Sequence, residues 1–277
     1  TDMLLLVWLY CVTRKNRPSV IYEVSDIHSM ALNNSKSIFN IMIKKILYNT
    51  ERLGMSVVDR LIVTSESFWT IYYKRLIPKA SVLFLPNTPQ KSTFKSYKKK
   101  KSGKFTVGFI GKVRYKDQLK MLIDASEKIE VDVLIAGNGV DLAEIKEYSK
   151  GKENVKIHGA YVYKDEIAKL YGSIDCIYSV YDTSIQNVKI ALPNRLYEAA
   201  ICGLPIIVSK GTELAKIVNE KELGIAIEDN NIDGLIKAII RLKDDSYRER
   251  IEQNCKRYYK EYSYDILNEK LYNTYID

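Results

Sequence analysis

Short apolar runs alternate with amphipathic segments through most of the chain, most regularly after residue 104. An apolar run bounded by turn residues predicts a buried strand, whereas apolar positions three and four apart predict a helix. In this part the predicted strands are 105–110, 131–136, 155–157, 174–180, 206–208 and 225–227. The predicted helices are 117–128, 140–149, 164–171, 193–203, 232–242, 247–258 and 264–272. Strands that alternate with helices predict an α/β fold with a doubly wound parallel sheet.

The first part of the chain repeats this pattern less regularly. Strands are predicted at 3–10, 19–24, 60–64 and 80–85, and a long helix is predicted at 35–58. The chain opens at Thr1, without an initiator methionine, directly on the apolar run at 3–10. We therefore expect it to begin within a domain.

A polar and strongly basic segment, 91–104, separates the two parts. Such a composition is typical of a solvated linker. We therefore expect an incomplete first domain over 1–95, a basic linker over 96–104, a second domain over 105–258 and a closing helical segment over 259–277.

Composition narrows the classes of function. The chain has 277 residues, of which 46% are hydrophobic and 28% charged, so it can bury the cores of two globular domains. Its four cysteines are far apart and it has two histidines, which argues against a disulfide framework, a zinc site and a Ser-His-Asp triad. The cysteine spacing favours a reducing cytoplasm. The net charge of +9 favours an anionic partner, namely a nucleotide diphosphate, nucleic acid or an acidic membrane surface.

The stretch 192–209, LPNRLYEAAICGLPIIVS, combines a predicted short helix with a buried strand. Pro193 suits a helix start, Asn194 is predicted to cap the free amides there, and Gly203 ends the helix. Glu198 lies in the first turn, where free amides and the helix dipole attract anions. A carboxylate there can accept sugar hydroxyls while the amides face a phosphate, which suits a nucleotide sugar. The alternative, that Glu198 is only a favourable charge at a helix start, stays open.

Glycines follow the predicted strands at their carboxyl ends. Gly111 comes after the strand 105–110 and is followed by Lys112, Arg114 and Lys116. A glycine there lets a phosphate approach backbone amides, and the cations can neutralise it. Further glycines follow later strands, at 137, 139, 159 and 211. Each alone is an ordinary turn residue, but together on one sheet edge they indicate an anionic ligand. No loop matches the P-loop or the dinucleotide fingerprint.

In the first part, the strand 19–24 leads into a loop that carries Asp26 and His28. Ligands of open α/β sheets bind at the carboxyl ends of strands, so either side chain can meet a substrate hydroxyl; a purely solvated loop is the alternative. The helix 35–58 also has two interpretations. It is either an ordinary amphipathic core helix, which we favour, or a basic and apolar face that touches a membrane.

Several of these segments together resemble a known family. The segment 105–227 resembles the donor-binding domain of retaining family 4 glycosyltransferases, which have the GT-B fold of two Rossmann-like domains. The segments that carry the resemblance are FIGKVRYKDQL (109–119), IAGNG (135–139), VKIHGAY (155–161), PNRLYEAAICGLPIIVS (193–209) and GTE (211–213). Residues 19–87 resemble the later part of the acceptor domain, and the C-terminal helices resemble those that cross back to it.

The resemblance implies a role for each matched position. Glu198 would hold the ribose hydroxyls, Gly111 would contact the diphosphate through its backbone, and the turn from His158 to Tyr161 would lie near the base. The implied donor-binding residues are Gly111, Lys112, His158, Gly159, Tyr161, Asn194 and Glu198. The implied catalytic residues are Arg114, Lys116 and Arg195, and the predicted acceptor-side residues are Asp26 and His28. The resembled family uses no metal and no cofactor, and it retains the anomeric configuration.

The sequence departs from the family pattern at three places. Many members carry a second glutamate eight positions before Glu198, which contacts the transferred sugar; this position is Ile190 here. The basic loop after Gly111 is shorter than usual. The glycine-bearing strand–turn–helix unit that opens the family's acceptor domain is absent, so we expect a GT-B-like fold whose N-terminal domain is incomplete.

The resemblance therefore implies a metal-independent glycosyltransferase in surface polysaccharide biosynthesis. It would move a sugar from a UDP- or GDP-sugar to a glycan or lipid-linked acceptor with retention. The predicted location is the cytoplasm, with peripheral contact at the anionic inner face of a membrane, and no nucleic acid is expected as a partner. Two alternatives stay open: a sugar-nucleotide epimerase of the same fold, and a non-catalytic nucleotide-binding remnant. An epimerase needs a pair of acid/base carboxylates, and no good pair is found.

Overall fold

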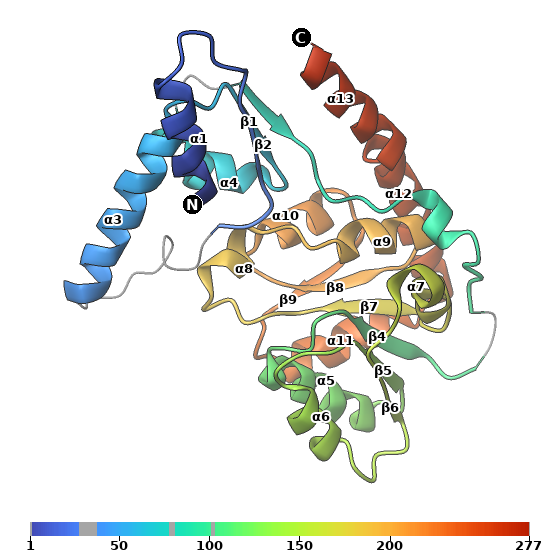
Figure 1. Cartoon of the computed structure of the whole chain (residues 1–277). Helices are drawn as coiled ribbons and strands as arrows, with labels where there is room; N and C mark the ends of the chain where they lie inside the picture. The colour runs from blue at the N-terminus through green and yellow to red at the C-terminus, as the bar shows by residue number, and fades with distance from the viewer. Residues whose placement is uncertain (1, 28–37, 78–80, 101–102, 277) are drawn as a thin grey trace. The chain divides into compact units, whose positions relative to one another are not determined.

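The computed structural model describes residues 2–27, 38–77, 81–100 and 103–276. The chain forms two compact units (Figure 1). The first unit comprises Thr1–Pro86 and Ile185–Leu192, and the second comprises Asn87–Ser184 and Pro193–Asp277. In the described part of the chain, no helix combines the length and the apolar character needed to cross a bilayer.

The first unit is built on a parallel sheet with the strand order β1-β2-β3. Its elements are α1 (Asp2–Val12), β1 (Ile21–Val24), α3 (Ile38–Met55), β2 (Arg60–Val63), α4 (Glu66–Ile71), the 3-10 helix η1 (Tyr73–Arg75), β3 (Ser81–Phe84) and α8 (Gln186–Ile190). The side chains of Met55, Leu61 and Phe68 are fully buried in its core. The strands predicted at 19–24, 60–64 and 80–85 are confirmed.

Residues 3–10, which were predicted as a strand, belong to helix α1, so this prediction was wrong. Periodicity alone cannot separate a buried strand from a buried helix in a continuous apolar run, and leucine is a strong helix former. Leu4 and Cys11, two turns apart, are buried. A Cβ at Gly54 of α3 would lie only 2.6 Å from Leu4 Cγ, so this glycine allows α1 and α3 to approach closely.

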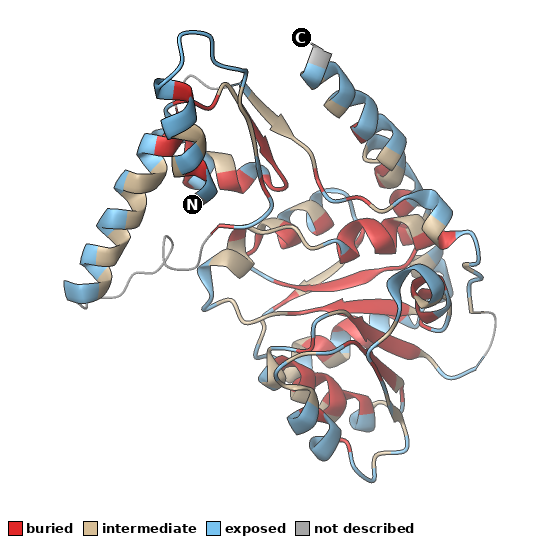
Figure 2. Ribbon diagram, in the orientation of Figure 1, coloured by how far each residue is buried: buried red, intermediate tan, exposed pale blue. Residues whose placement is uncertain are grey.

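The second unit contains a six-stranded parallel sheet in the order β6-β5-β4-β7-β8-β9. Its strands are β4 (Thr106–Ile110), β5 (Asp132–Ala136), β6 (Val155–Gly159), β7 (Cys176–Ser179), β8 (Ile206–Ser209) and β9 (Gly224–Ile227). The strand order extends first to one side of β4 and then, from β7, to the other, so the switch point lies between β4 and β7. Every residue of β4, β7 and β8 is buried (Figure 2). The predicted doubly wound sheet is confirmed.

The helices of the second unit follow the predicted alternation, with two additions, the 3-10 helix at 91–94 and helix α10. They are the 3-10 helix η2 (Lys91–Phe94), α5 (Lys116–Lys128), α6 (Leu142–Tyr148), α7 (Tyr163–Gly172), α9 (Arg195–Cys202), α10 (Glu213–Glu220), α11 (Ile232–Leu242), α12 (Asp245–Glu261) and α13 (Tyr264–Ile276). Helix α10 was not predicted, because 210–213 were interpreted only as a glycine turn. Thr212 caps it by accepting a hydrogen bond from the backbone of Ala215.

The segment predicted as a solvated linker is packed onto the second unit as far as it is described. The buried Phe94 ring meets Tyr171 edge-on, with 5.7 Å between ring centroids. The Tyr97 hydroxyl donates to the carbonyl of Cys202 at 2.8 Å, and Lys99 pairs with Glu252 at 2.5 Å. The boundary expected at 96–104 therefore differs from the observed one, because two aromatic side chains anchor a basic segment that looked uniformly polar.

Candidate functional site

The carboxyl ends of β4, β5 and β6 are joined by backbone hydrogen bonds between glycine loops. Gly111 donates to the carbonyl of Ala136 at 2.8 Å, and Gly137 donates to the carbonyl of Gly159 at 2.6 Å. Gly111 and Gly137 adopt φ values of +138° and +142°, which side chains rarely tolerate. A Cβ at Gly137 would collide with the carbonyl oxygen of Gly111. The predicted glycine edge is therefore a compact strip of backbone that runs from β4, beside the switch point, to β6.

The Arg195 side chain lies directly against Gly111. A Cβ at Gly111 would collide with Arg195 Nη2, and the guanidinium stacks over the Phe109 ring at 4.2 Å. Arg195 Nη1 donates to the Tyr181 hydroxyl, which follows β7. Only 9% of Arg195 is exposed, and no carboxylate pairs with it among the described residues. A buried cation without a counter-charge is costly, so this arrangement favours an anionic ligand.

Glu198 lies one helical turn after Arg195, in the first turn of α9, and is only 4% exposed. Each of its carboxylate oxygens accepts a hydrogen bond from a phenol of α7: Tyr163 at 2.7 Å and Tyr171 at 2.6 Å. The pKa values of both phenols are raised, first by burial and then by the negative charge of Glu198. Both phenols therefore stay protonated and act as donors to the carboxylate.

The other predicted phosphate-binding cations differ in their surroundings. Lys112 and Arg114 are exposed in the loop after Gly111, and the Arg114 guanidinium stacks over Tyr115 at 5.1 Å. Lys116 begins α5, and its Nζ lies 3.1 Å from a carboxylate oxygen of Glu144. That ion pair raises the Lys116 pKa and directs its charge toward α6. The structure therefore places Arg195, rather than Lys116, against the glycine strip.

The residues predicted near the base lie at the end of β6 and just beyond it. His158 Nε2 is 3.1 Å from Glu166 Oε1, so its ring is held by α7. Gly159 adopts φ +80° and accepts the hydrogen bond from Gly137. Tyr161 is half-buried, and its pKa is raised by burial and by the charge of Glu198. This turn therefore leads from the glycine strip toward Glu198.

Asn194 does not cap α9 as predicted. It occupies the N-cap position, but its side chain is exposed and makes no cap hydrogen bond, since its backbone is already helical at φ −53° and ψ −29°. Its carbonyl instead accepts the backbone N–H of Glu198 at 3.0 Å. The end of this helix is as predicted: Gly203 is a left-handed C-cap at φ +67°.

The predicted acceptor-side positions belong to the first unit. Asp26 accepts a hydrogen bond from the amide of Asn187 in α8, and His28 lies outside the described residues. Ile190, at the position of the family's second glutamate, is 7% exposed and packs in the core of this unit. Its carbonyl accepts the buried hydroxyl of Ser65 at 2.5 Å. Ile190 therefore has a structural role in α8.

Sequence reasoning missed four aromatic residues that shape the site: Phe109, Tyr163, Tyr171 and Tyr181. Each lies in a strand, a helix or a connecting turn whose pattern is explained by core packing alone. The chain has 21 tyrosines, so tyrosine content marks no particular position. Their roles depend on side chains that approach from other elements, which no local pattern reports.

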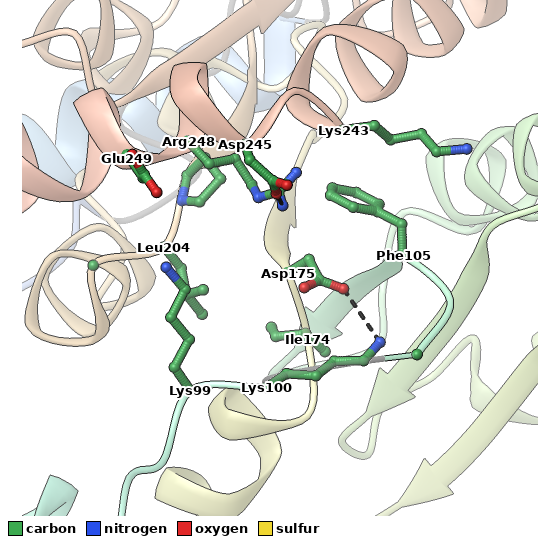
Figure 3. A pocket seen from close by; sticks show the side chains of 13 residues that line it. Lys99, Lys100, Phe105, Ile174, Asp175, Leu204, Lys243, Asp245, Arg248 and Glu249 are labelled. Carbon is green, nitrogen blue, oxygen red and sulfur yellow. Dashed lines mark hydrogen bonds and ion pairs between the residues drawn. The ribbon is translucent and has the colours of Figure 1, made fainter.

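A cavity of about 520 Å³ lies at the opposite edge of the same sheet (Figure 3). It is lined by residues that precede β4, β7 and β8, including Phe105, Asp175 and Leu204. Lys100 points at Asp175 across it, with 3.2 Å between the charged atoms, and Arg248 pairs with Asp245 on its wall. Its charges are thus largely matched within the protein, unlike that of Arg195. In the described residues, no three His, Cys, Asp or Glu side chains gather as metal ligands.

Residues 104–245 match the family model described as glycosyl transferases group 1. The succinoglycan biosynthesis protein ExoL of Rhizobium meliloti (strain 1021) is 24% identical over 249 residues, which cover 84% of this chain and 60% of that protein. HepE from Anabaena, solved in complex with UDP and glucose, is similar over 100% of this chain and 76% of its own, with 15% identity and a TM-score of 0.74. The sucrose-phosphate synthase from Thermosynechococcus elongatus is similar over 98% of this chain and 71% of its own, with 16% identity and a TM-score of 0.73.

These likenesses confirm the predicted fold class, an α/β fold of GT-B type with parallel sheets. The family match includes all six strands of the second unit, together with Gly111, Arg195 and Glu198. It covers just over half of the printed sequence. The chain belongs to the glycosyl transferases group 1 family.

Proposed function

We propose that this chain is a glycosyltransferase that moves a sugar from a UDP- or GDP-sugar to a glycan or lipid-linked acceptor. One observation carries the proposal: a buried cation, Arg195, and a buried carboxylate, Glu198, lie one helical turn apart at the switch-point edge. The cation can bind a diphosphate, and the carboxylate can accept hydrogen bonds from the hydroxyls of a ribose. The UDP complexes of HepE support UDP as the first nucleotide to test, and the name of ExoL supports polysaccharide biosynthesis.

In this proposal the nucleotide sugar is held by backbone and side-chain groups of the second unit. Glu198 accepts the ribose hydroxyls, and the diphosphate lies against the backbone at Gly111, where the absence of a Cβ allows close approach. Arg195 neutralises the charge that builds on the leaving phosphate oxygen as the bond between that oxygen and the sugar's anomeric carbon breaks. A preorganised hydrogen-bond donor of this kind lowers the activation barrier by about 3–4 kcal/mol. Lys112 and Arg114 are exposed and supply further positive charge beside the same loop.

The finer features of the reaction follow from the family resemblance. We propose retention of the anomeric configuration, independence from metal ions and no cofactor. Lys116 serves the phosphate only after it leaves Glu144. Since Ile190 replaces the family's second glutamate and is buried in α8, another group contacts the transferred sugar. The acceptor side is assigned to the first unit, including Asp26, and the segment 259–277 to a return toward that unit.

We also propose that the first unit contacts an anionic membrane through the exposed faces of α1 and α3. Apolar side chains dominate these faces, with exposed fractions of 72% for Met3, 60% for Leu6, 85% for Ile38 and 64% for Phe39. The acidic residue of α3, Glu51, is turned inward, where it accepts the Tyr72 hydroxyl at 2.5 Å. Exposed cations of α3 at positions 45 and 52 complement anionic headgroups.

The membrane proposal is tested by sedimentation with phosphatidylcholine vesicles that contain or lack phosphatidylglycerol. Binding that needs phosphatidylglycerol and is weakened by the paired change Ile38→Ser and Phe39→Ser supports it. Equal binding by the wild type and the variant contradicts it.

The donor site is tested by calorimetric titration of the protein with UDP, GDP and ADP. We expect one nucleotide to bind, and Glu198→Gln to weaken it by about 1–3 kcal/mol, the usual value of a hydrogen bond to a charged group. Glu127→Gln is the matched control, because Glu127 pairs with Lys152 on the surface of the same unit, away from α9. An equal effect of both substitutions would contradict the assigned site.

Product analysis then separates the reaction classes. Release of the nucleoside diphosphate from UDP-glucose or GDP-mannose, dependent on an acceptor extract, supports transfer. Release of a free sugar-nucleotide epimer supports the epimerase alternative. Nucleotide binding without turnover in any mixture supports a non-catalytic remnant.

A further inference from the structure

Each oxygen of the buried Glu198 carboxylate already accepts a tyrosine hydroxyl in the structure. Tyr163 donates to Oε1 and Tyr171 donates to Oε2, and only 4% of the residue is exposed. A ribose diol needs access to the same two oxygens, and with only 4% of Glu198 exposed a ligand reaches them only if one of the covering phenols moves. This feature conflicts with the role proposed for Glu198 unless one phenol moves.

The two tyrosines differ sharply in their freedom to move. Tyr171, in the last turn of α7, is fully buried and meets the buried Phe94 ring edge-on. Moving it would open a cavity in the core, which costs several kcal/mol. Tyr163, in the first turn of the same helix, is 39% exposed. Exposed side chains change rotamer on the picosecond to nanosecond scale, and moving Tyr163 into solvent breaks its hydrogen bond to Glu198 without opening a core cavity.

We infer that Tyr163 is a resident competitor for the ribose site, and that Tyr171 is the positioning residue that keeps the Glu198 carboxylate in place. The inference rests on the proposed function, since it names what the donor must displace. When a nucleotide binds, the ribose takes over the hydrogen bond of Tyr163 to Oε1, and the Tyr171 bond to Oε2 persists. Before binding, the Tyr163 phenol supplies a second hydrogen bond to this buried charge, beside that of Tyr171.

The two roles predict opposite effects from the same chemical change. Tyr163→Phe removes the bond that the ribose must break, so the affinity for UDP should rise about 3- to 10-fold, in line with the net value of one hydrogen bond. Tyr171→Phe removes the bond that fixes the carboxylate, so the affinity should fall by about the same factor. A merely structural role for Tyr163 predicts no gain, because losing a structural bond does not tighten a ligand.

Calorimetric titration with UDP of the wild type and the two variants tests the inference, with GDP and ADP used if UDP does not bind. Tyr148→Phe is the matched control, because the Tyr148 phenol donates to Asp124 at 2.8 Å in the same unit, far from α9 along the chain. Titration with 2′,3′-dideoxyuridine diphosphate isolates the ribose contact. It lacks both hydroxyls, so Tyr163→Phe should not tighten it.

The outcomes separate this inference from the proposed function. A tighter UDP complex for Tyr163→Phe, absent with the dideoxy nucleotide and in Tyr148→Phe, supports the competitor role. Unchanged or weaker binding by Tyr163→Phe, in a protein whose wild type binds UDP, overturns the inference and leaves the donor site standing. Failure of the wild type and of Tyr163→Phe to bind any of the three nucleotides overturns both. If Tyr171→Phe unfolds, the binding of UDP and of 2′,3′-dideoxyuridine diphosphate by Tyr163→Phe still tests the competitor role.

Discussion

Replacing Gly137 by alanine should destabilise the second unit more than any other glycine change at the candidate site. Gly137 has φ +142°, and a Cβ there would lie far inside van der Waals contact with the carbonyl oxygen of Gly111. That oxygen belongs to the backbone and cannot swing aside like the end of a side chain. The loops after β4 and β5 would therefore have to separate, which breaks the glycine strip.

The expected loss of stability is the sum of two energies, backbone strain at a positive φ and overpacking of the added Cβ. Two other glycines allow each energy to be measured alone. A disfavoured positive φ costs about 1–2 kcal/mol for a residue with a Cβ. Overpacking against a fixed neighbour adds typically about 1–3 kcal/mol. Gly151→Ala carries the first term alone, because Gly151 has φ +76° and nothing lies within 4 Å of its added Cβ. Gly139→Ala carries the second alone, because its Cβ would collide with the carbonyl of Val113 without a left-handed φ. We expect Gly137→Ala to lower the free energy of unfolding by about 2–5 kcal/mol, the sum of both terms.

Urea unfolding followed by far-UV circular dichroism measures these losses. Both tryptophans, Trp8 and Trp69, lie in the first unit, so their fluorescence separately reports that unit. A loss in the dichroism transition, with the tryptophan transition unchanged, would locate the damage in the second unit. If Gly137→Ala proved no more destabilising than Gly151→Ala, the reasoning from the Gly111 carbonyl would be refuted. Gly137→Ala should also reduce UDP binding, since it displaces the amides of the strip.

Three further predictions concern Arg195, Asp59 and the cysteines. Arg195→Lys should weaken UDP binding about 10-fold in calorimetry, because lysine keeps the charge but lacks the planar group that stacks on Phe109. Hydrogen bonds from Arg17 lower the Asp59 pKa to about 2. The ionised Asp59 therefore stabilises the folded protein above pH 4, and this stabilisation is lost as the pH falls toward 2. Since solvent screens this exposed pair, the contribution is small, and the stability gap between wild type and Asp59→Asn, read by tryptophan fluorescence, should close over that range. Burial should prevent the cysteines from reacting with a thiol reagent at pH 8 until urea unfolds the chain, and fast labelling of the native protein would contradict this. These cysteines are Cys11, Cys176, Cys202 and Cys255.

The parts of the fold that were predicted correctly depend on local patterns. Buried parallel strands are continuous apolar runs, and their alternation with helices leaves few topologies. The glycine edge was predictable because positive φ and close backbone approach both demand glycine locally, as Gly111 and Gly137 show. The place of Glu198 at a helix start was predictable from spacing alone.

The errors arose where contacts between distant residues decided the outcome. The run at 3–10 became helix α1 because it packs against α3, and the apolar pattern suited either structure. The basic segment after residue 90 packs onto the second unit through Phe94 and Tyr97, two aromatic residues among lysines. The error at Asn194 was local: its own backbone is helical, so its side chain makes no cap hydrogen bond.

The sequence by itself determined the α/β class, the alternation of strands and helices in the second unit and the glycines at its sheet edge, because periodicity and backbone freedom are local properties. Only the tertiary structure decided which charges are neutralised. Lys116 forms an ion pair with Glu144, whereas Arg195 pairs with no carboxylate among the described residues. Both carboxylate oxygens of Glu198 accept hydrogen bonds from tyrosines of α7. Ion pairs and hydrogen bonds between elements depend on side-chain positions within a few ångströms, and the packing of the whole unit sets those positions.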